Sequence, residues 1–409
     1  MRKTGGKRME VCVIGAGAAG LMAAVAAAKS GAAVTVLEAM DKPGKKISIT
    51  GNGRCNLTNR GIQNAAPYFS DAPETADGII RGFPAEDTVH FYENLGLLMK
   101  EREGGLIYPY SDQAQSVVNA LLQEVRRRKI KLKCRERVVS VEKKQDRFYI
   151  KTEGWHYEAD RVVLACGGKA APQTGSDGMG YVLAKSLGHT VTEPLPALVP
   201  LTAKLSFGSL LDGVRSRAGI TLRIDGKAIA REKGELQWTG YGISGIAVFQ
   251  LSSQAVRALQ KKKKVEAEID LLPDFAENEL TERVRDREGT YEEILGGFYH
   301  AKVLKALLKE AKAAAGEKAV PEKIGSLIKM SKHLRLHLTG SRSFEQAQVT
   351  AGGIPLQEVK ETTLESRKTK GLFLAGELLD VDGPCGGYNL QWAWASGYAA
   401  GSSAGKGDL

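Results

Sequence analysis

The sequence has 409 residues, of which 43% are hydrophobic and 26% are charged, and this length predicts two or three domains around separate cores. Its net charge of +11 favours anionic partners such as nucleotides, nucleic acid or an acidic membrane. The five cysteines are scattered and include no CxxC or CxxxxC pair, which argues against a cysteine-based zinc site and fits a reducing cytoplasm.

The N-terminus superficially looks like an export signal, because the basic residues 1–8 precede an uncharged stretch, Val11–Ala28. Three glycines at fixed spacing interrupt that stretch and instead predict a strand, a turn and a helix. No other segment approaches the roughly 18 consecutive apolar residues of a membrane span. We therefore expect a cytoplasmic protein without a membrane anchor.

The first elements are typical of a βαβ unit. The run Glu10–Ile14 predicts a buried parallel strand, and it leads through the turn GAGAAG into an alanine-rich helix, Leu21–Ser30. A second strand follows over Ala33–Leu37 and ends in Glu38. A GxGxxG turn indicates a dinucleotide site when it stands in this context.

Each glycine of the turn has its own role in such a site. Gly15 permits the tight turn, Gly17 lets the backbone approach a pyrophosphate, and Gly20 lets the helix pack on the strand. The helix N-terminus offers N–H groups and a positive dipole to the phosphates. Glu38 can accept hydrogen bonds from both ribose hydroxyls and would repel a 2′-phosphate. This unit predicts dinucleotide binding without separating NAD from FAD.

A polar, glycine-rich stretch follows over Lys42–Asn59 and is expected at the carboxyl edge of the sheet, where ligands bind in open α/β folds. Lys45, Lys46 and Arg54 are candidates to offset phosphate charge. The alternative is a flexible basic loop. Cys55 lacks the CxxxxC partner that disulfide reductases need, so it either touches the ring of the bound cofactor or is a small buried residue.

Two basic runs, Arg126–Lys129 and Lys261–Lys264, contribute to the positive charge. Each follows a stretch with helical patterning, where cations complement the partial negative charge of a helix C-terminus. No aromatic residues interleave these runs, as stacking platforms for bases would require. We interpret both as solvated helix ends and regard nucleic-acid binding as the less favoured interpretation.

Two later segments repeat the pattern of a hydrophobic strand that runs into glycine. They are Asp160–Gly168 (DRVVLACGG) and Gly371–Glu377 (GLFLAGE). With the first strand they form an ordered trio that resembles the glutathione-reductase-like FAD superfamily, where the strands return to one sheet around the cofactor. That resemblance implies that Glu377 binds the sugar-alcohol chain between flavin and pyrophosphate.

The C-terminal segment Asp382–Gly397 contains the glycine pair Gly386 and Gly387, and a helix is predicted from Tyr388 onward. A helix N-terminus beside the flavin pyrimidine would stabilise the negative charge of reduced flavin. A capped C-terminal helix that docks on the core is the other interpretation, and both can hold together.

The middle of the chain has the pattern of an insertion. Pro194–Leu201 is an extended exit, Thr202–Leu272 is strand-like, Glu277–Lys332 is helical, and the chain returns through Gln346–Thr350. No second strand–GxGxxG–helix occurs there, so no dedicated nicotinamide domain is expected. We predict an α/β fold whose Rossmann-type FAD-binding domain comprises residues 1–193 and 346–409, with an inserted β-rich domain over 194–275 and a helical subdomain over 276–345.

The motifs KPGKKISITGNGRCNLTN, LACGG, VTAGG and AGELLDVDGPCGGYNLQ together resemble one bacterial family of NAD(P)/FAD-dependent oxidoreductases. Its members are aminoacetone oxidase-like or 3-oxo bile-acid reductase-like, and the match runs from Glu10 to Gly401. The resemblance implies non-covalent FAD in a split Rossmann domain with a β-rich and partly helical insertion.

One stretch departs from the family pattern. The family often carries a threonine-histidine pair followed by GLSGP, whereas Thr239–Ile246 (TGYGISGI) has neither the histidine nor the proline. A histidine-based role therefore cannot be carried over, and Thr239, Tyr241 and Ser244 remain as polar candidates. The pattern is closer to the bile-acid-reductase-like branch.

From the motifs and the resemblance together we expect Tyr241 and Arg54 to be the catalytic candidates, acting on the substrate carbonyl. The residues predicted to bind FAD are Gly15, Ala16, Gly17, Ala19, Gly20, Glu38, Ala39, Lys45, Lys46, Gly53, Arg54, Cys55, Asn56, Val138, Ala165, Cys166, Gly167, Gly376, Glu377, Gly387, Asn389 and Leu390.

The leading hypothesis for the reaction is hydride transfer from NAD(P)H through FAD to an electron-poor C=C bond, such as that of a steroid-like or other enone. NAD(P)H would have to enter transiently at the face that the substrate later uses. The alternative is an FAD-dependent amine oxidase that passes electrons to oxygen. A nucleic-acid-binding flavoprotein and a flavin sensor are the remaining interpretations.

The six histidines show no metal-ligand spacing with cysteines or carboxylates, so no metal is expected. His333 and His337 are four apart and would share a face if they lay on a helix.

Overall fold

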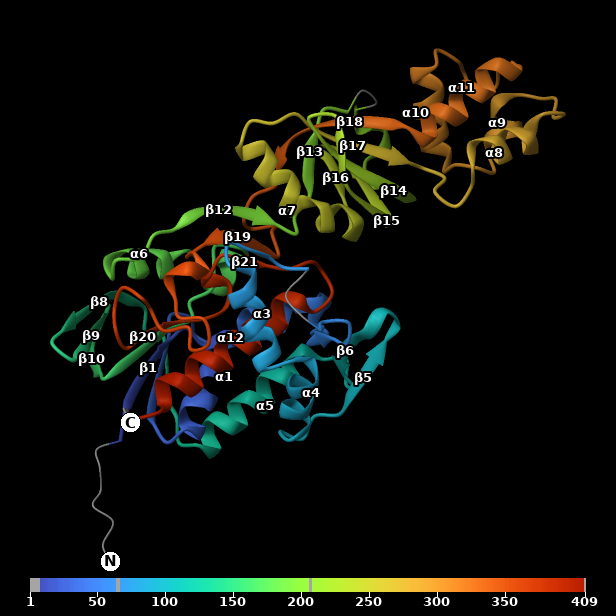
Figure 1. The fold of residues 1–409 in the computed structure, drawn as a ribbon. Coiled ribbons are helices and arrows are strands. Elements are labelled where there is room, and N and C mark those ends of the chain that lie inside the picture. Colours follow the sequence, from blue (N-terminus) through green and yellow to red (C-terminus); the bar gives the residue numbers. More distant parts are fainter. Residues whose placement is uncertain (1–7, 64–66, 206–207, 408–409) are drawn as a thin grey trace, which may run out of the picture. The chain divides into compact units, whose positions relative to one another are not determined.

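The structure, a computed structural model, describes residues 8–63, 67–205 and 208–407 (Figure 1). The chain divides into two compact units. Unit 1 contains residues 1–195 and 349–409, and unit 2 contains residues 196–348. Unit 1 is thus assembled from both ends of the chain, with unit 2 inserted between them.

Unit 1 is built on a five-stranded parallel sheet in the order β20-β11-β1-β2-β7. Val13 of β1 aligns with Val36 of β2 on one side and Val163 of β11 on the other. All three valines are fully buried, which explains why these strands are nearly continuous hydrophobic runs. The strands are β1 (Glu10–Ile14), β2 (Ala33–Glu38), β7 (Lys131–Cys134), β11 (Arg161–Leu164) and β20 (Leu372–Leu374).

The central strands come from three distant parts of the sequence. β1, β11 and β20 lie side by side, and Leu164 of β11 aligns with Ile14 of β1 and Leu374 of β20. The predicted trio of strands and the split Rossmann-type fold are therefore confirmed. Because the strands are parallel, the glycines that follow each strand meet at one edge of the sheet.

Helices and a second sheet cover the two faces of the parallel sheet. Helix α1 (Ala18–Lys29) packs on one face, and α12 (Tyr388–Gly405) packs against α1. Figure 1 shows the antiparallel sheet of β8 (Val138–Lys144), β9 (Arg147–Thr152) and β10 (His156–Ala159) on the other side. Helix α1 is apolar all round because it is covered on both sides.

Smaller elements complete unit 1. Its remaining helices are α2 (Lys45–Ile49), α3 (Pro73–Gly82), α4 (Ala85–Glu93), α5 (Ala114–Arg127) and α6 (Met179–Ser186). Its remaining strands are β3 (Thr58–Asn59), β4 (Phe69–Ser70), β5 (Met99–Arg102), β6 (Leu106–Pro109), β19 (Val349–Gly353) and β21 (Val381–Asp382), and β12 (Thr192–Ala197) begins in unit 1 and ends in the first residues of unit 2.

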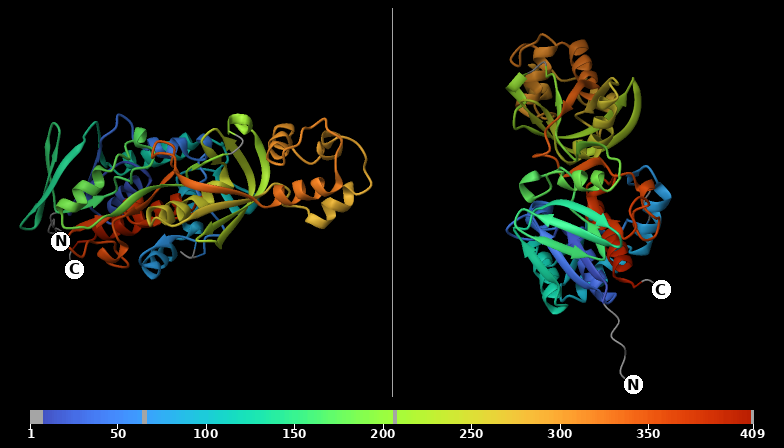
Figure 2. Two further views of the ribbon diagram at one scale, coloured as in Figure 1. Left: turned by 90° about the horizontal axis from the view of Figure 1, so that it is seen from above. Right: turned by 90° about the vertical axis from the view of Figure 1, so that its left-hand side faces the viewer.

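Unit 2 contains a closed barrel of six strands in the order β13-β16-β15-β14-β17-β18 (Figure 2). Side chains alternate between inside and outside, as along β17, and Trp238 fills the interior without exposed surface. The strands are β13 (Leu201–Ala203), β14 (Arg215–Ile224), β15 (Lys227–Thr239), β16 (Gly242–Ser244), β17 (Val265–Asp270) and β18 (Leu334–Ser341). The predicted β-rich insertion is confirmed.

The insertion also holds a helix within the stretch predicted as strand-like. Helix α7 (Ile246–Gln260) packs against β14 and β15 with the buried residues Val248, Leu251 and Ala255. These positions recur at helical spacing, so the prediction of strands throughout Thr202–Leu272 was wrong at this point because the local period was overlooked.

The helical part of the insertion contains α8 (Glu277–Val284), α9 (Tyr291–Leu295), α10 (Ala301–Glu310) and α11 (Pro321–Lys332). His333 caps the end of α11 and His337 lies in β18, so the two histidines do not share a helix face. Within the described ranges, no cluster of three or more His, Cys, Asp or Glu side chains is arranged to hold a metal ion. No helix among the described residues is both long and apolar enough to cross a membrane.

Candidate cofactor-binding site

The turn between β1 and α1 is shaped around one open position. A Cβ at Gly15 would lie 2.5 Å from the carbonyl oxygen of Ala165, and one at Gly20 would lie 1.9 Å from that of Gly15. At Gly17, by contrast, nothing lies within 4 Å of the same position. Helix α1 begins directly after Gly17, and no side chain caps its N-terminus. Open space beside uncapped helix N–H groups fits a phosphate group.

Glu38 lies at the end of β2 and is 9% exposed. Its Oε2 accepts a hydrogen bond from the backbone N–H of Ala16 at 2.7 Å, and its Oε1 accepts one from Met40 at 2.8 Å. The carboxylate is therefore held against the phosphate-binding turn. Each oxygen keeps a further lone pair, which fits a ribose hydroxyl.

The predicted basic residues of the glycine-rich stretch have different partners. Lys45 pairs with Asp41 at 2.6 Å on the surface, whereas Nζ of Lys46 donates to Oε2 of Glu377 at 2.7 Å. Arg54 is exposed. The stretch forms the short helix α2 and a tight turn, so it is more ordered than a flexible basic loop.

The turn after α2 is irregular and closely packed. Gly51, Asn52, Gly53 and Cys55 all have positive φ angles, from 54° to 79°. The Cys55 side chain is fully buried, and burial raises its pKa to about 12. The thiol is therefore un-ionised at neutral pH, and the interpretation of Cys55 as a small buried residue fits best.

Strand β11 continues directly into Ala165, Cys166 and Gly167, three of the predicted cofactor residues. Gly167 has a φ of 72°, and a Cβ there would lie 2.5 Å from Oγ of Ser176. Burial is the largest cause that raises the pKa of Cys166 to about 12, and the nearby carboxylate of Glu38 adds to it. Neither buried cysteine is a thiolate at neutral pH.

The N-terminus of α12 is fixed from several sides. Gly387, with a φ of 95°, packs on the backbone of Thr58, and a Cβ there would lie 2.6 Å from the Thr58 carbonyl carbon. The Asn389 side chain binds the backbone of Gly383 through two hydrogen bonds, of 2.9 and 2.8 Å. The buried Gln391 donates to the carbonyl oxygen of Phe83 at 2.7 Å. These contacts hold the N-terminus of α12 against the segments that contain Thr58, Phe83 and Gly383.

Thr350 was not predicted as a site residue, although it lies in the VTAGG motif that supports the family resemblance. Its Oγ1 donates to Oε1 of Glu377 at 2.8 Å. The same oxygen accepts hydrogen bonds from the backbone N–H groups of Lys169 and Ala170. A polar residue inside an otherwise fully buried strand was the signal that could have identified it.

The two catalytic candidates lie in different units. Arg54 of unit 1 is near Asp112, whose pKa is lowered first by the hydrogen bond from Lys100 and further by Arg102 and Arg54. Tyr241 of unit 2 lies in the turn between β15 and β16, with the guanidinium of Arg342 4.6 Å from the centre of its ring.

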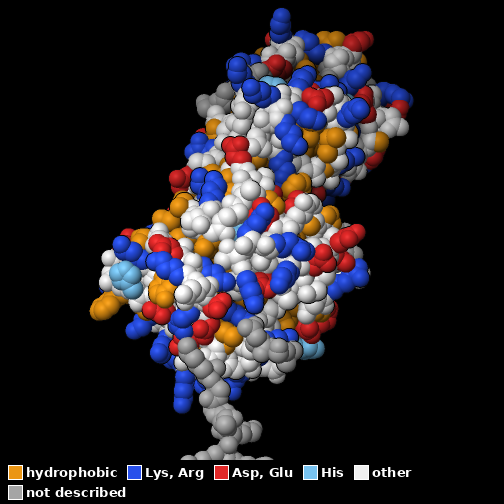
Figure 3. Space-filling view, turned by 60° about the vertical axis from the view of Figure 1, so that its left-hand side comes forward, with side chains coloured by type: hydrophobic (Ala, Val, Ile, Leu, Met, Phe, Trp, Pro, Cys, Tyr) orange, Lys and Arg blue, Asp and Glu red, His pale blue; other side chains and the backbone are white. Residues whose placement is uncertain are grey.

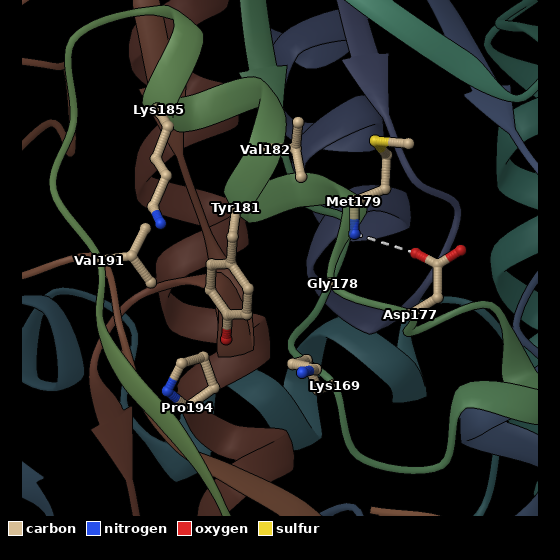
Figure 4. A pocket seen from close by; sticks show the side chains of 9 residues that line it. All are labelled: Lys169, Asp177, Gly178, Met179, Tyr181, Val182, Lys185, Val191 and Pro194. Atoms are coloured by element: carbon tan, nitrogen blue, oxygen red, sulfur yellow. Dashed lines mark hydrogen bonds between the residues drawn. The ribbon is translucent and has the colours of Figure 1, made fainter.

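Unit 1 also has an open pocket of about 430 Å³ beside α6. Figure 4 shows Tyr181 and Lys185 extending from α6 toward Val191 and Pro194, with Lys169 at the lower end. The Tyr181 hydroxyl is buried and has no hydrogen-bond partner within the described part of the chain. None of the predicted cofactor residues lines this pocket.

The chain is similar to several characterised proteins. It is 42% identical to the 3-dehydro-bile acid delta(4,6)-reductase of Clostridium scindens, with 96% of this chain and 98% of the relative covered. It is 31% identical to the ribosomal RNA dihydrouridine synthase of Escherichia coli, with 96% and 97% covered.

Among solved structures, the 3-ketosteroid delta1-dehydrogenase of Sterolibacterium denitrificans has a TM-score of 0.51 at 13% identity, with 97% of this chain and 99% of that chain covered. This likeness supports the fold. Residues 9–403 match the family described as the HI0933-like protein Rossmann domain. The expected resemblance to FAD-dependent oxidoreductases is thereby confirmed, and the chain belongs to the HI0933-like Rossmann-domain family.

Proposed function

We propose that the protein is an FAD-dependent reductase that takes hydride from NAD(P)H and delivers it to a C=C bond conjugated to a carbonyl group. The shape of the turn at Gly17 carries the cofactor part of this proposal, because it leaves space only where a phosphate would approach. Glu38 and Glu377 stand at the carboxyl ends of β2 and β20, where the ribose and the sugar-alcohol chain would bind. Once bound, FAD supplies the hydride chemistry, and the protein supplies orientation and charge.

The names of both curated relatives support a reductase over an oxidase. A delta(4,6) double-bond system in a 3-oxo steroid is conjugated to the carbonyl group, and so is the C5=C6 bond that is saturated in dihydrouridine. Such a double bond accepts hydride at its far carbon while negative charge develops on the carbonyl oxygen. The higher identity to the bile-acid relative favours a steroid-like enone as the substrate.

Two residues of this chain, one in each unit, are alternative candidates to act on the developing charge. Either the phenol of Tyr241 would donate a proton to the substrate, or the guanidinium of Arg54 would bind the carbonyl oxygen. A positioned proton donor typically contributes a factor of about 10² to 10⁴ in rate. Tyr241→Phe should therefore slow substrate reduction far more than it weakens FAD binding, and Arg54→Met should slow the reduction only if the guanidinium is the group that acts.

Anaerobic stopped-flow spectroscopy tests the reaction. NADH or NADPH should bleach the flavin absorbance of the purified protein, and a 4-en-3-one steroid added afterwards should restore it. Gly17→Ala is the control for the cofactor site, because its methyl group would occupy the open phosphate position in a protein that otherwise folds. Failure of both nicotinamides to bleach the flavin would remove the proposal, and peroxide formation with amines alone would favour the amine oxidase.

A second candidate substrate is uracil within ribosomal RNA. It is favoured by the relative at 31% identity and by the net charge of +11. Figure 3 shows Lys and Arg side chains distributed over the visible face among acidic ones, without a single basic stripe. If RNA is the substrate, uridine-containing RNA should reoxidise the reduced protein, and its binding should weaken steeply with salt.

A further inference from the structure

The Glu377 carboxylate is held by the protein on both of its oxygens. Oε2 accepts the hydrogen bond from Nζ of Lys46, and Oε1 accepts two from Thr350, one from the backbone N–H at 3.0 Å and one from the hydroxyl at 2.8 Å. Nζ of Lys46 also donates to the carbonyl oxygen of Ala170 at 3.2 Å. The side chains of Lys46 and Glu377 are 25% and 20% exposed, so the ion pair is largely shielded from water.

The Thr350 hydroxyl uses its full hydrogen-bonding capacity in this network. A hydroxyl has one hydrogen to donate and two lone pairs to accept with. In Thr350 the hydrogen goes to Glu377, while the N–H groups of Lys169 at 2.8 Å and Ala170 at 3.0 Å occupy the oxygen. The residue is 1% exposed, so no solvent competes for these bonds.

The network joins four segments that are far apart in the sequence. They are helix α2, the turn after β11, strand β19 and the turn after β20. Gly168 is required where they meet, because a Cβ there would lie 2.3 Å from Oγ1 of Thr350 and 2.8 Å from Oε1 of Glu377. Helix α2 is in turn tied to the phosphate-binding turn, since the N–H of Gly44 donates to the carbonyl oxygen of Ala16 at 2.8 Å.

We propose that Lys46 and Thr350 are positioning residues of the cofactor site, which fix the orientation of Glu377 and balance its negative charge. The proposal rests on the FAD-dependent function proposed above. It assigns Lys46 to the carboxylate instead of to a phosphate, and it gives Thr350 a role that the sequence did not suggest.

The charge balance has a consequence for reduction of the cofactor. Reduction of FAD adds negative charge to the site, and a cation in the site favours that change. Without Lys46 the Glu377 carboxylate would be uncompensated, so the cofactor should be harder to reduce.

Two single variants and one double variant of the protein test this proposal. FAD titration measures the affinity, and reduction in equilibrium with a reference dye measures the midpoint potential of the bound flavin. Lys46→Met should weaken FAD binding about tenfold or more, the scale of one charge-assisted hydrogen bond, and should make the midpoint potential more negative. Lys144→Met is the matched control, because Lys144 on β8 also forms an ion pair, with Glu142 at 3.0 Å, but at the exposed surface, and it should stay within about twofold of the wild type. Adding Glu377→Gln to Lys46→Met should move the potential back toward the wild-type value, because the uncompensated charge is gone.

Thr350 variants give an independent measurement. Thr350→Val removes the donor to Glu377 and the acceptor of the Lys169 and Ala170 N–H groups, so FAD affinity should fall, while Thr350→Ser should restore it. The proposal is overturned if Lys46→Met matches Lys144→Met in affinity and potential, or if adding Glu377→Gln to Lys46→Met brings no recovery. A wild-type protein that takes up no FAD would instead overturn the proposed function. FAD titration of the wild type is therefore done first and separates the two failures.

Discussion

His189 has hydrogen-bond partners like those of a catalytic histidine, but it is buried and a substrate could not reach it. Its Nδ1 lies 2.8 Å from Oε2 of Glu358, and its Nε2 lies 2.7 Å from Oγ of Ser366. The series of carboxylate, imidazole and hydroxyl is that of a hydrolase triad. Ser366, however, is 3% exposed and also accepts the backbone N–H groups of Lys368 and Thr369. The three side chains therefore crosslink the segment before β12 to the segment before β20.

This crosslink predicts a loss of stability in weak acid. Burial lowers the pKa of His189 below its ordinary 6.5. Burial alone would raise the pKa of Glu358, but hydrogen bonds from Thr190 and His189 outweigh it and the pKa is lowered. Because both groups bind protons more readily when unfolded, the stability they confer is present above pH 6.5, and it declines below that for His189 and below 4.5 for Glu358.

Urea unfolding of unit 1 between pH 7.5 and 5 measures this effect. The wild-type midpoint should fall as the pH drops below 6.5, and His189→Asn should be less stable but flatter over the same range. His156→Asn, which changes an exposed histidine on β10, is the control and should follow the wild type. Equal slopes for all three proteins would contradict the prediction.

At the scale of elements, glycines in α12 set how closely this helix packs against α1. Gly397, Gly401 and Gly405 recur every four residues along one face of α12. A Cβ at these positions would lie 2.4, 2.2 and 2.5 Å from the carbonyl oxygens of Ala19, Ala23 and Ala27, respectively. The two helices thus pack backbone to backbone along the pair, which only glycine facing alanine permits.

Gly401→Ala should therefore force the two helices apart. We expect a loss of about 1–3 kcal/mol in the free energy of unfolding, the usual cost of overpacking, together with weaker FAD binding because α12 leads into the cofactor edge. Gly78→Ala in α3 is the matched control, since this exposed helical glycine has nothing within 4 Å of its Cβ position. It should be neutral or stabilising by up to about 1 kcal/mol. Denaturant unfolding that ranks the two variants in the opposite order would contradict this account.

At the scale of the whole molecule, each unit contains a sheet of its own, the parallel sheet in unit 1 and the barrel in unit 2. The parallel sheet carries the predicted cofactor residues, apart from Val138 at the start of β8, on the turns and segments at its edge. Among the described residues, the six barrel strands lie between 201 and 341 and pair with one another in a closed order. A cofactor that binds the folded state of unit 1 should thus stabilise that unit selectively.

Removal of FAD tests this division. At a free ligand concentration of about 100 times Kd, binding contributes about 2.7 kcal/mol, which the apo-protein would lack. In native-state hydrogen exchange, amides of β1, α1 and β11 should lose protection when FAD is removed, whereas the paired amides of β14 and β17 should keep theirs. A parallel loss in the barrel would show that the units unfold as one.

The amino-acid sequence by itself determined the local elements of the sheet and its phosphate-binding turn. Hydrophobic runs such as Glu10–Ile14 match the observed strand end to end, and a Cβ at Gly15 or Gly20 of the turn would collide with the backbone, whereas the position at Gly17 is open. Both basic runs lie at helix C-termini, since Arg126–Lys129 spans the end of α5 and Lys261–Lys264 follows α7. These features depend on neighbours within a few residues, so the local sequence pattern is enough to predict them.

Only the tertiary structure decided which distant residues share the site. Lys46, Thr350 and Glu377 are separated by up to 331 residues, and nothing in their local sequence says that one carboxylate would take up both partners. The glycine face of α12 could not be interpreted from the sequence either, because its role depends on the packing of α12 against α1. Hydrogen bonds and close packing between segments depend on how the sheet brings its strand ends together, and that arrangement is a property of the folded chain.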